Sequence, residues 1–215
     1  QLKKSNERMI DVLGTVVEYR NMEERSHLTM VKGFTEILAN HMMQDYPEYG
    51  LTEEKIKIIV SASVLHDIGK VMIPDAILLK PGKLTGEEFE YMKSHSIRGY
   101  DMIESIKELW EEDYVKCSME ITRSHHEKYD GGGYPDGLKG DEIPISAQLV
   151  SVADCYAALI SESVYKDAIP LDEAFNMILQ GECGVFSYKL LECFRKAKEE
   201  LKEVAKVCGI TGEEI

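Results

Sequence analysis

Several features are scarce in this sequence of 215 residues, and each shortage excludes a class of protein. The five cysteines are odd in number, scattered, and never arranged as C-x-x-C, which argues against a disulfide framework and against a thiolate zinc site. No apolar stretch approaches the ~18 residues of a membrane span, and there is no signal-peptide pattern. Because the first residue is Gln rather than Met, we expect a fragment of a longer protein, and the cysteine pattern suits a reducing cytoplasm.

Basic residues are also in short supply. The sequence has 25 Lys and Arg against 39 Asp and Glu, for a formal net charge of −14. A surface of this sign repels polyanions, so a nucleic-acid polymer is not an expected partner. A small phosphate ester could still bind where divalent metal ions reverse the local field. Any phosphate chemistry in this protein is therefore expected to be metal-centred.

No segment shows a convincing alternating strand pattern, and helical periodicity dominates, so we predict an all-α fold. Helices are expected at about 22–44, 53–66, 86–107, 111–126, 145–162, 171–180 and 187–207. One domain, residues 21–215, is long enough to bury a sizeable core. It follows an N-terminal helix at 1–20.

That N-terminal segment has apolar residues at heptad-like spacing, namely Leu2, Met9, Val12, Val16 and Tyr19. So few heptads leave two interpretations open. The segment is either a coiled-coil signalling stalk, which would favour a homodimer, or a first helix packed on the domain.

Local signals mark where helices begin and where loops lie. Thr52 and Thr85 are expected to cap helices, and Thr85 begins a capping box with Glu88. The run 130–137 is rich in Gly and contains Pro, so it cannot continue a helix. A long glycine-rich loop in a compact helical domain is usually functional.

Ionisable residues that suit metal binding stand at unusual places along the chain. Glu23 and His27 are four residues apart on an expected helix, so both side chains share one face. The doublet His66-Asp67 ends an apolar helix, and Asp154 interrupts the apolar run 149–159, where an unpartnered charge would be costly. Each such residue alone could be an ordinary hydrogen-bonded group. Together they indicate a metal cluster, from which only His41 of the six histidines is left out.

A string of motifs resembles the HD-GYP family, the cyclic di-GMP phosphodiesterases of the HD superfamily. The principal motifs are His66-Asp67-Ile68-Gly69-Lys70, His125-His126-Glu127 and Gly133-Tyr134-Pro135-Asp136-Gly137-Leu138. Family-like spacing continues through Ile73-Pro74-Asp75, Lys80-Pro81-Gly82, His95, Gly140, Ile143-Pro144 and Val152-Ala153-Asp154, so the match runs from about 12 to 195.

The resemblance implies an HD-domain helical bundle with a long GYP loop, and hydrolysis of cyclic di-GMP to pGpG and/or GMP in bacterial signalling. It implies eight metal ligands: Glu23, His27, His66, Asp67, His95, His125, His126 and Asp154. The presence of both Glu23 and His27 favours three metal ions over two, and Asp67 would bridge two of them. Asp67 and Lys70 are the implied catalytic residues, and Lys70, Gly133, Tyr134 and Lys166 would contact substrate.

Mixed nitrogen and oxygen ligands without thiolates point to iron or manganese, with other first-row metals open, and the family favours iron. The family also suggests an upstream receiver or sensor domain and a contact between the GYP loop and diguanylate cyclases.

The sequence departs from the family pattern at two places. Ser163 stands where the family usually has an arginine, which removes a bidentate phosphate donor. Ser187 replaces an aspartate and could still cap the last helical segment. Two alternatives therefore stay open: a phosphohydrolase for another cyclic dinucleotide or a nucleotide, and a non-catalytic module that binds a nucleotide or a partner.

Overall fold

The structure is a computed structural model that describes residues 10, 12–17, 19–20, 26–162 and 168–210. Within these ranges every regular element is a helix, which confirms the predicted all-α fold. The α-helices are α2 (Ser26–Asp45), α3 (Glu53–Ala62), α4 (Asp75–Leu78), α5 (Gly86–Lys93), α6 (His95–Ser105), α7 (Glu112–Ser124), α8 (Ile145–Ile160), α9 (Leu171–Gln180), α10 (Tyr188–Lys196) and α11 (Lys198–Val207). Short 3₁₀ helices lie between them: η1 (Pro47–Tyr49), η2 (Ser63–Leu65), η3 (Ile68–Met72), η4 (Lys107–Leu109) and η5 (Gly140–Glu142).

Two of the predicted helix starts are confirmed in atomic detail. The Thr52 hydroxyl accepts a hydrogen bond from the Lys55 backbone N–H at 3.2 Å. At α5, the Thr85 hydroxyl accepts from the Glu88 N–H while the Glu88 carboxylate accepts from the Thr85 N–H. These bonds satisfy N–H groups that have no partner within the first helical turn.

Three predicted helices are interrupted, and Ser187 does not act as expected. The range 86–107 contains two α-helices, α5 and α6, which are separated at Ser94, whose hydroxyl donates to the Tyr91 carbonyl. The range 53–66 is α-helical only to Ala62 and then tightens into η2. The range 187–207 breaks at the buried Ala197. Ser187 occupies the N-cap position of α10, but its side chain makes no capping hydrogen bond.

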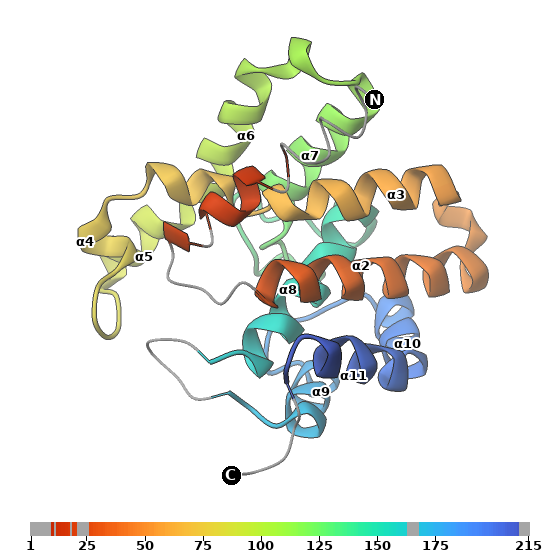
Figure 1. Ribbon diagram of the computed structural model, residues 1–215. Coiled ribbons are helices and arrows are strands. Elements are labelled where there is room, and N and C mark those ends of the chain that lie inside the picture. Colours follow the sequence, from red (N-terminus) through yellow and green to blue (C-terminus); the bar gives the residue numbers. More distant parts are fainter. Residues whose placement is uncertain (1–9, 11, 18, 21–25, 163–167, 211–215) are drawn as a thin grey trace.

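Helix α2 is the centre of the main core. It packs against α3 and α8, and on another side against α10 and α11 (Figure 1). Phe34 of α2 is fully buried and lies 5.1 Å from the ring of Tyr156 in α8, measured between ring centroids. Further along the chain, α6 and α7 form a hairpin-like pair whose lower end meets α3. The ends of α2, α6, α7 and α8 are thereby brought toward one region.

A smaller core joins the N-terminal segment to the domain. Ile10 and Val17 are buried in one cluster with Leu65, Ile68 and Ile103. Residues 12–17 are helical, and three members of the heptad-like series, Val12, Val16 and Tyr19, are exposed. The face that packs on the domain therefore differs from the face that the heptad pattern defines.

Five residues named in the sequence analysis lie outside the described residues, namely Leu2, Met9, Glu23, Ser163 and Lys166. Among the residues that the structure does describe, no helix is long and apolar enough to cross a bilayer.

Candidate metal centre

Seven of the eight predicted ligands gather in two adjoining groups. Within each group, the ligand atoms all lie within 4.8 Å of one another. The first group is Asp67, His95, His125 and His126, and the second is His27, His66 and Asp154. The eighth, Glu23, lies outside the described residues. Side chains far apart in the sequence thus form one cluster.

Asp67 connects the two groups. Its Oδ1 lies 3.2 Å from His95 Nε2 and 3.7 Å from His125 Nε2, while its Oδ2 lies 3.3 Å from His66 Nε2. Asp154 Oδ1 in turn lies 3.2 Å from His27 Nε2 and 3.5 Å from His66 Nε2. One carboxylate therefore faces imidazoles of both groups, the arrangement expected of a bridging ligand.

Backbone carbonyls fix the orientation of three of these imidazoles. His66 Nδ1 lies 2.8 Å from the Ser63 carbonyl oxygen, and His95 Nδ1 lies 2.7 Å from that of Met92. His125 Nδ1 lies 3.1 Å from the carbonyl oxygen of Ile121. With Nδ1 as the donor, each ring keeps the lone pair on Nε2, which points into the cluster. Metal-binding histidines in proteins are usually oriented in this way.

Two atoms at the centre of the cluster show that it suits a cation. His66 Nε2 and Asp67 Oδ1 are buried and have no hydrogen-bond partner among the described residues. Leaving such groups without a partner is costly. A divalent ion would satisfy both of them together with the neighbouring imidazoles, so the residues present fit a metal site.

The protonation states of the outer imidazoles also suit coordination. Burial lowers the pKa of His95 to about 4, and burial together with His125 and His95 holds the pKa of His126 well below its usual range. Both rings are therefore neutral at neutral pH, the form that binds metal. At His66 burial opposes protonation, but Asp67 and Asp154 outweigh it and raise the pKa. The same carboxylates would attract a metal ion.

Glycine explains how His95 comes so close to Asp67. A Cβ on Gly69 of η3 would lie 1.9 Å from the His95 carbonyl oxygen, and 2.6 Å from the Gly99 backbone nitrogen. On the other side, a Cβ on Gly99 would lie 2.4 Å from Thr122 Cγ2 of α7. Only residues without a side chain allow η3, α6 and α7 to approach to this distance.

The GYP loop, which contains the motif from Gly133 to Leu138, folds back on the pair His125-His126. The Tyr134 ring stacks on His126 with 4.7 Å between centroids, and the Tyr134 N–H donates to the His126 carbonyl. A Cβ on Gly133 would lie 2.4 Å from the Glu127 Cα, so this turn too requires glycine. Gly133 and Tyr134 therefore lie beside the cluster, where the sequence analysis expected substrate contacts.

Lys70 lies beside Asp67 at the edge of the cluster. The residue belongs to η3 rather than to a continued α-helix, and its Nζ lies 2.6 Å from Asp67 Oδ2. Its side chain is 18% exposed, so the ammonium group sits at the edge of the cluster rather than inside it. A phosphate bound at the cluster would lie within its electrostatic reach.

Sequence reasoning missed the part that Glu127 plays in holding the loop. Its buried carboxylate accepts hydrogen bonds from the backbone N–H groups of Asp136, Gly137 and Leu138, at 2.7, 3.1 and 3.1 Å. The only signal in the sequence was the position of a glutamate directly after two histidines and before the glycine-rich loop.

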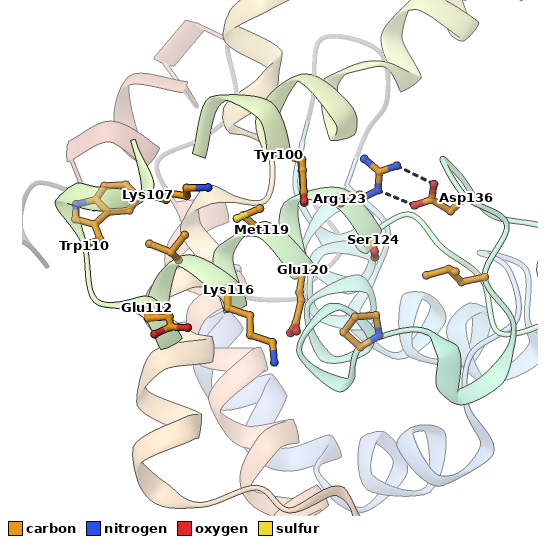
Figure 2. Close-up of a pocket in the computed structure, with 13 residues that line it drawn as sticks. Tyr100, Lys107, Trp110, Glu112, Lys116, Met119, Glu120, Arg123, Ser124 and Asp136 are labelled. Atoms are coloured by element: carbon orange, nitrogen blue, oxygen red, sulfur yellow. Dashed lines mark hydrogen bonds and ion pairs between the residues drawn. The ribbon is translucent and has the colours of Figure 1, made fainter. Parts of the chain in front are cut away.

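A groove of about 680 Å³ lies away from the cluster, and none of the seven clustered residues lines it. Lys107 and Trp110 lie toward one end of it, and Arg123 forms two ion-pair contacts with Asp136 at the other (Figure 2). These contacts, at 2.7 and 2.8 Å, tie α7 to the GYP loop. The groove thus borders the loop without reaching the donor atoms.

Comparison with known proteins identifies the family. A model described as HD domain matches residues 19–184, which is more than half of the chain. The chain belongs to the HD domain family. The match covers all eight predicted ligands, including Glu23.

Curated relatives of this HD domain confirm the HD-GYP resemblance. A protein from Thermotoga maritima named cyclic di-GMP phosphodiesterase is 39% identical over 91% of the chain and 50% of its own length. A Vibrio cholerae protein named 3'3'-cGAMP-specific phosphodiesterase 2 is 36% identical over 89% of the chain and 34% of its own length. The chain thus spans half or less of the length of these two relatives.

A solved structure shows the same fold. Bd1817, described as a HDG"Y"P protein from Bdellovibrio bacteriovorus, superposes with a TM-score of 0.60 over 91% of this HD domain and 64% of that chain. Its sequence is 19% identical, so the likeness concerns the fold alone.

Proposed function

We propose that this HD domain hydrolyses cyclic di-GMP to pGpG and/or GMP in bacterial second-messenger signalling. The proposal rests on the pair of adjoining donor groups centred on Asp67, with His66 Nε2 and Asp67 Oδ1 buried and without a hydrogen-bond partner among the described residues. The 39% identity to a cyclic di-GMP phosphodiesterase supports this choice of substrate.

The proposed cofactor is two or three divalent metal ions. Imidazole and carboxylate donors without thiolates suit iron, manganese or another first-row metal, and the resemblance to the HD-GYP family favours iron. When bound, such ions activate a water molecule and polarise the phosphoryl oxygens. The proposed ligands are Glu23, His27, His66, Asp67, His95, His125, His126 and Asp154.

The remaining side chains would bind and orient the phosphodiester. The Lys70 ammonium, 2.6 Å from Asp67, would contact a phosphoryl oxygen or the departing ribose oxygen. The Tyr134 ring, stacked on His126, offers an aromatic face and a hydroxyl beside the same site, and Gly133 lets the backbone come close. We assign Lys166 to phosphate binding from the HD-GYP resemblance alone.

Three partnerships belong to the same proposal. We propose an upstream receiver or sensor domain, since the two relatives above contain further chain outside the match. We also propose a homodimer formed through the exposed apolar residues of segment 12–19, and a contact between the GYP loop and a diguanylate cyclase.

A second substrate, 3'3'-cGAMP, is favoured by one specific observation. A relative named as specific for that dinucleotide is 36% identical, close to the value for the cyclic di-GMP enzyme. Ser163, in place of the usual arginine, is a position where the two specificities could differ.

The deciding experiment combines metal analysis with a substrate panel. Protein purified without oxygen is expected to contain first-row metal and to hydrolyse cyclic di-GMP faster than 3'3'-cGAMP. His66→Ala and Asp67→Ala should lose metal and turnover while keeping the helical circular dichroism spectrum. His41→Ala is the control, because His41 pairs with Glu200 away from the cluster.

Metal-replete protein that binds a cyclic dinucleotide but hydrolyses none would establish the non-catalytic module instead. Faster hydrolysis of 3'3'-cGAMP would establish the second substrate.

A further inference from the structure

Arg20 links the N-terminal helical segment to the segment that contains Lys70. Its guanidinium donates to the Lys70 carbonyl oxygen at 2.8 Å and to the Ile73 carbonyl oxygen at 2.7 Å, and it also contacts the Val71 carbonyl oxygen. A further bond of 2.8 Å reaches the Asp75 carboxylate. One side chain thus holds four acceptors spread along residues 70–75.

These acceptors need a donor. The segment is the end of η3 and the residues just beyond it: the Lys70 carbonyl also accepts from the Ile73 N–H at 3.0 Å, whereas the Val71 and Ile73 carbonyls have no backbone N–H partner among the described residues and carry partial negative charge. Arginine suits them because its planar guanidinium presents several N–H donors in a fixed fork, whereas lysine has only one nitrogen. The contact therefore fixes the course of the backbone immediately after Lys70.

The N-terminal segment that contains Arg20 is itself packed on the domain. Val17, three residues before Arg20 in the sequence, is 4% exposed and belongs to the same buried cluster as Ile68, the first residue of η3. Arg20 thus extends from a helical segment packed on the element whose carbonyl groups it binds. A side chain anchored in this way can restrict where Lys70 lies.

We propose that Arg20 is a positioning residue that acts through Lys70. By holding the carbonyl groups of residues 70, 71 and 73, it orients η3 so that the Lys70 ammonium stays beside Asp67, 2.6 Å from Oδ2. Among the described residues, the hydrogen bonds of the Arg20 side chain go to residues 70–75 and not to the seven clustered ligands. This inference rests on the proposed phosphodiesterase activity.

A double-mutant cycle tests the proposal in the metal-loaded protein. Arg20→Gln is expected to lower kcat roughly tenfold to a hundredfold, the scale of effect of a misplaced catalytic group, with metal content unchanged. In a Lys70→Ala background the same change should lower kcat only about twofold or less. Arg20 acts through the Lys70 ammonium, so its replacement has little further effect once that ammonium is gone. Arg20→Lys, which keeps the charge with fewer donors, should fall between the parent and Arg20→Gln.

Amide hydrogen exchange gives an independent structural readout. Peptides covering residues 68–78 should exchange faster in Arg20→Gln, and peptides from α9 should not change. Arg195→Gln is the matched control, since it removes an arginine whose pair with Glu192 is local to α10.

Equal losses of kcat in the parent and Lys70→Ala backgrounds would overturn the proposal, as would loss of metal in Arg20→Gln. Unchanged exchange of residues 68–78 would overturn it even if Lys70→Ala had no measurable activity. If the parent itself hydrolysed no cyclic dinucleotide, the proposed function would fail, and the exchange experiment would still decide whether Arg20 holds η3.

Discussion

Glu127 illustrates how one side chain can determine the shape of a functional loop. Its carboxylate is 2% exposed and has three backbone N–H groups of the GYP loop as partners. Hydrogen bonds to an ionised acceptor are stronger than those between neutral groups. The loop conformation that places Tyr134 on His126 therefore depends on a residue that does not itself reach the cluster.

Replacing that carboxylate with an amide should loosen the loop. In Glu127→Gln, one oxygen becomes an NH₂ group that would face an N–H donor, so we expect a loss of about 2 kcal/mol in the free energy of unfolding. Urea denaturation measures the loss. Glu142→Gln is the control, because Glu142 also accepts a backbone N–H, from Lys139, but at an exposed position. Equal effects of both changes would contradict the role given to Glu127.

The sequence predicted the residues of the metal centre, but it could not predict the contacts of Arg20. The His66-Asp67 doublet and Asp154 were recognisable because ionisable groups in apolar runs are rare and costly. Arg20 gave no such signal, since an arginine near a helix end is ordinary until its partners at residues 70–75 are known. Only the folded chain reveals contacts of that kind.

Close packing between helical elements is the feature that most constrains the metal centre. Gly69 of η3 sits against the backbone of α6, which presents His95 to Asp67. A side chain there would separate the two elements that bring these ligands together. Packing and ligand geometry are thus linked through a residue that binds nothing.

Gly69→Ala should therefore damage both stability and metal binding. Its Cβ would lie 1.9 Å from the His95 carbonyl oxygen, a backbone atom that cannot move independently, and we expect a loss of roughly 2–3 kcal/mol in unfolding free energy. Metal content, measured by elemental analysis, should also fall. Gly86→Ala is the matched control, since no atom lies within 4 Å of its added Cβ. Normal metal content in Gly69→Ala would show that α6 does not need this close approach.

The attachment of α9 to α11 gives a prediction about pH. Asp172 of α9 lies 2.6 Å from Lys198 and 2.9 Å from Lys202, both in α11, and these lysines lower its pKa from 3.8 to about 2. A carboxyl group with a lowered pKa stabilises the fold above its unfolded pKa, and this contribution disappears as the pH falls toward the folded value. Because Asp172 is 62% exposed, the contribution at neutral pH should be only about 0.5 kcal/mol.

Asp172→Asn should accordingly lower the urea midpoint slightly at pH 7, and the difference from the parent should shrink as the pH falls from 4 toward 2. Added salt should reduce it as well. If the difference in urea midpoint between Asp172→Asn and the parent persisted at low pH, side-chain packing rather than charge would join α9 to α11.

Element boundaries show the limit of periodicity as a guide. Helical spacing continues unbroken through 86–107, yet α5 has no buried residue and α6 buries His95, Ser96, Gly99 and Ile103. The two halves pack in different environments, and the break at Ser94 allows both. Periodicity indicates a helix, but tertiary packing decides where it changes direction.

At the scale of the whole molecule, the metal centre is the place where distant parts of the chain meet. His27 comes from α2, His95 from α6 and Asp154 from α8, while His125 follows the end of α7. In a chain with a net charge of −14, two of the acidic side chains, the buried Asp67 and the half-buried Asp154, lie in the cluster. Bound cations would both neutralise these groups and join the helices.

Metal binding should therefore raise the stability of the entire domain. An ion that binds only the folded state adds about 2.7 kcal/mol when its free concentration is about 100 times Kd. For a domain of this size, that corresponds to a rise of roughly 5–10 °C in Tm. Differential scanning fluorimetry without oxygen should show this rise when Fe²⁺ or Mn²⁺ is added to chelator-treated protein, and Mg²⁺, which prefers oxygen ligands, should give a smaller one.

Two variants, His66→Ala and His41→Ala, show whether the stabilising ions bind at this cluster or at other acidic residues on the negatively charged surface. His66→Ala removes a central imidazole and leaves the exposed carboxylates unchanged, so its Tm should no longer respond to Fe²⁺ or Mn²⁺. His41→Ala should respond like the parent, because His41 lies with Glu200 outside both donor groups. An equal rise of Tm in His66→Ala and the parent would place the stabilising ions elsewhere, since weak binding to scattered surface carboxylates does not depend on one buried imidazole.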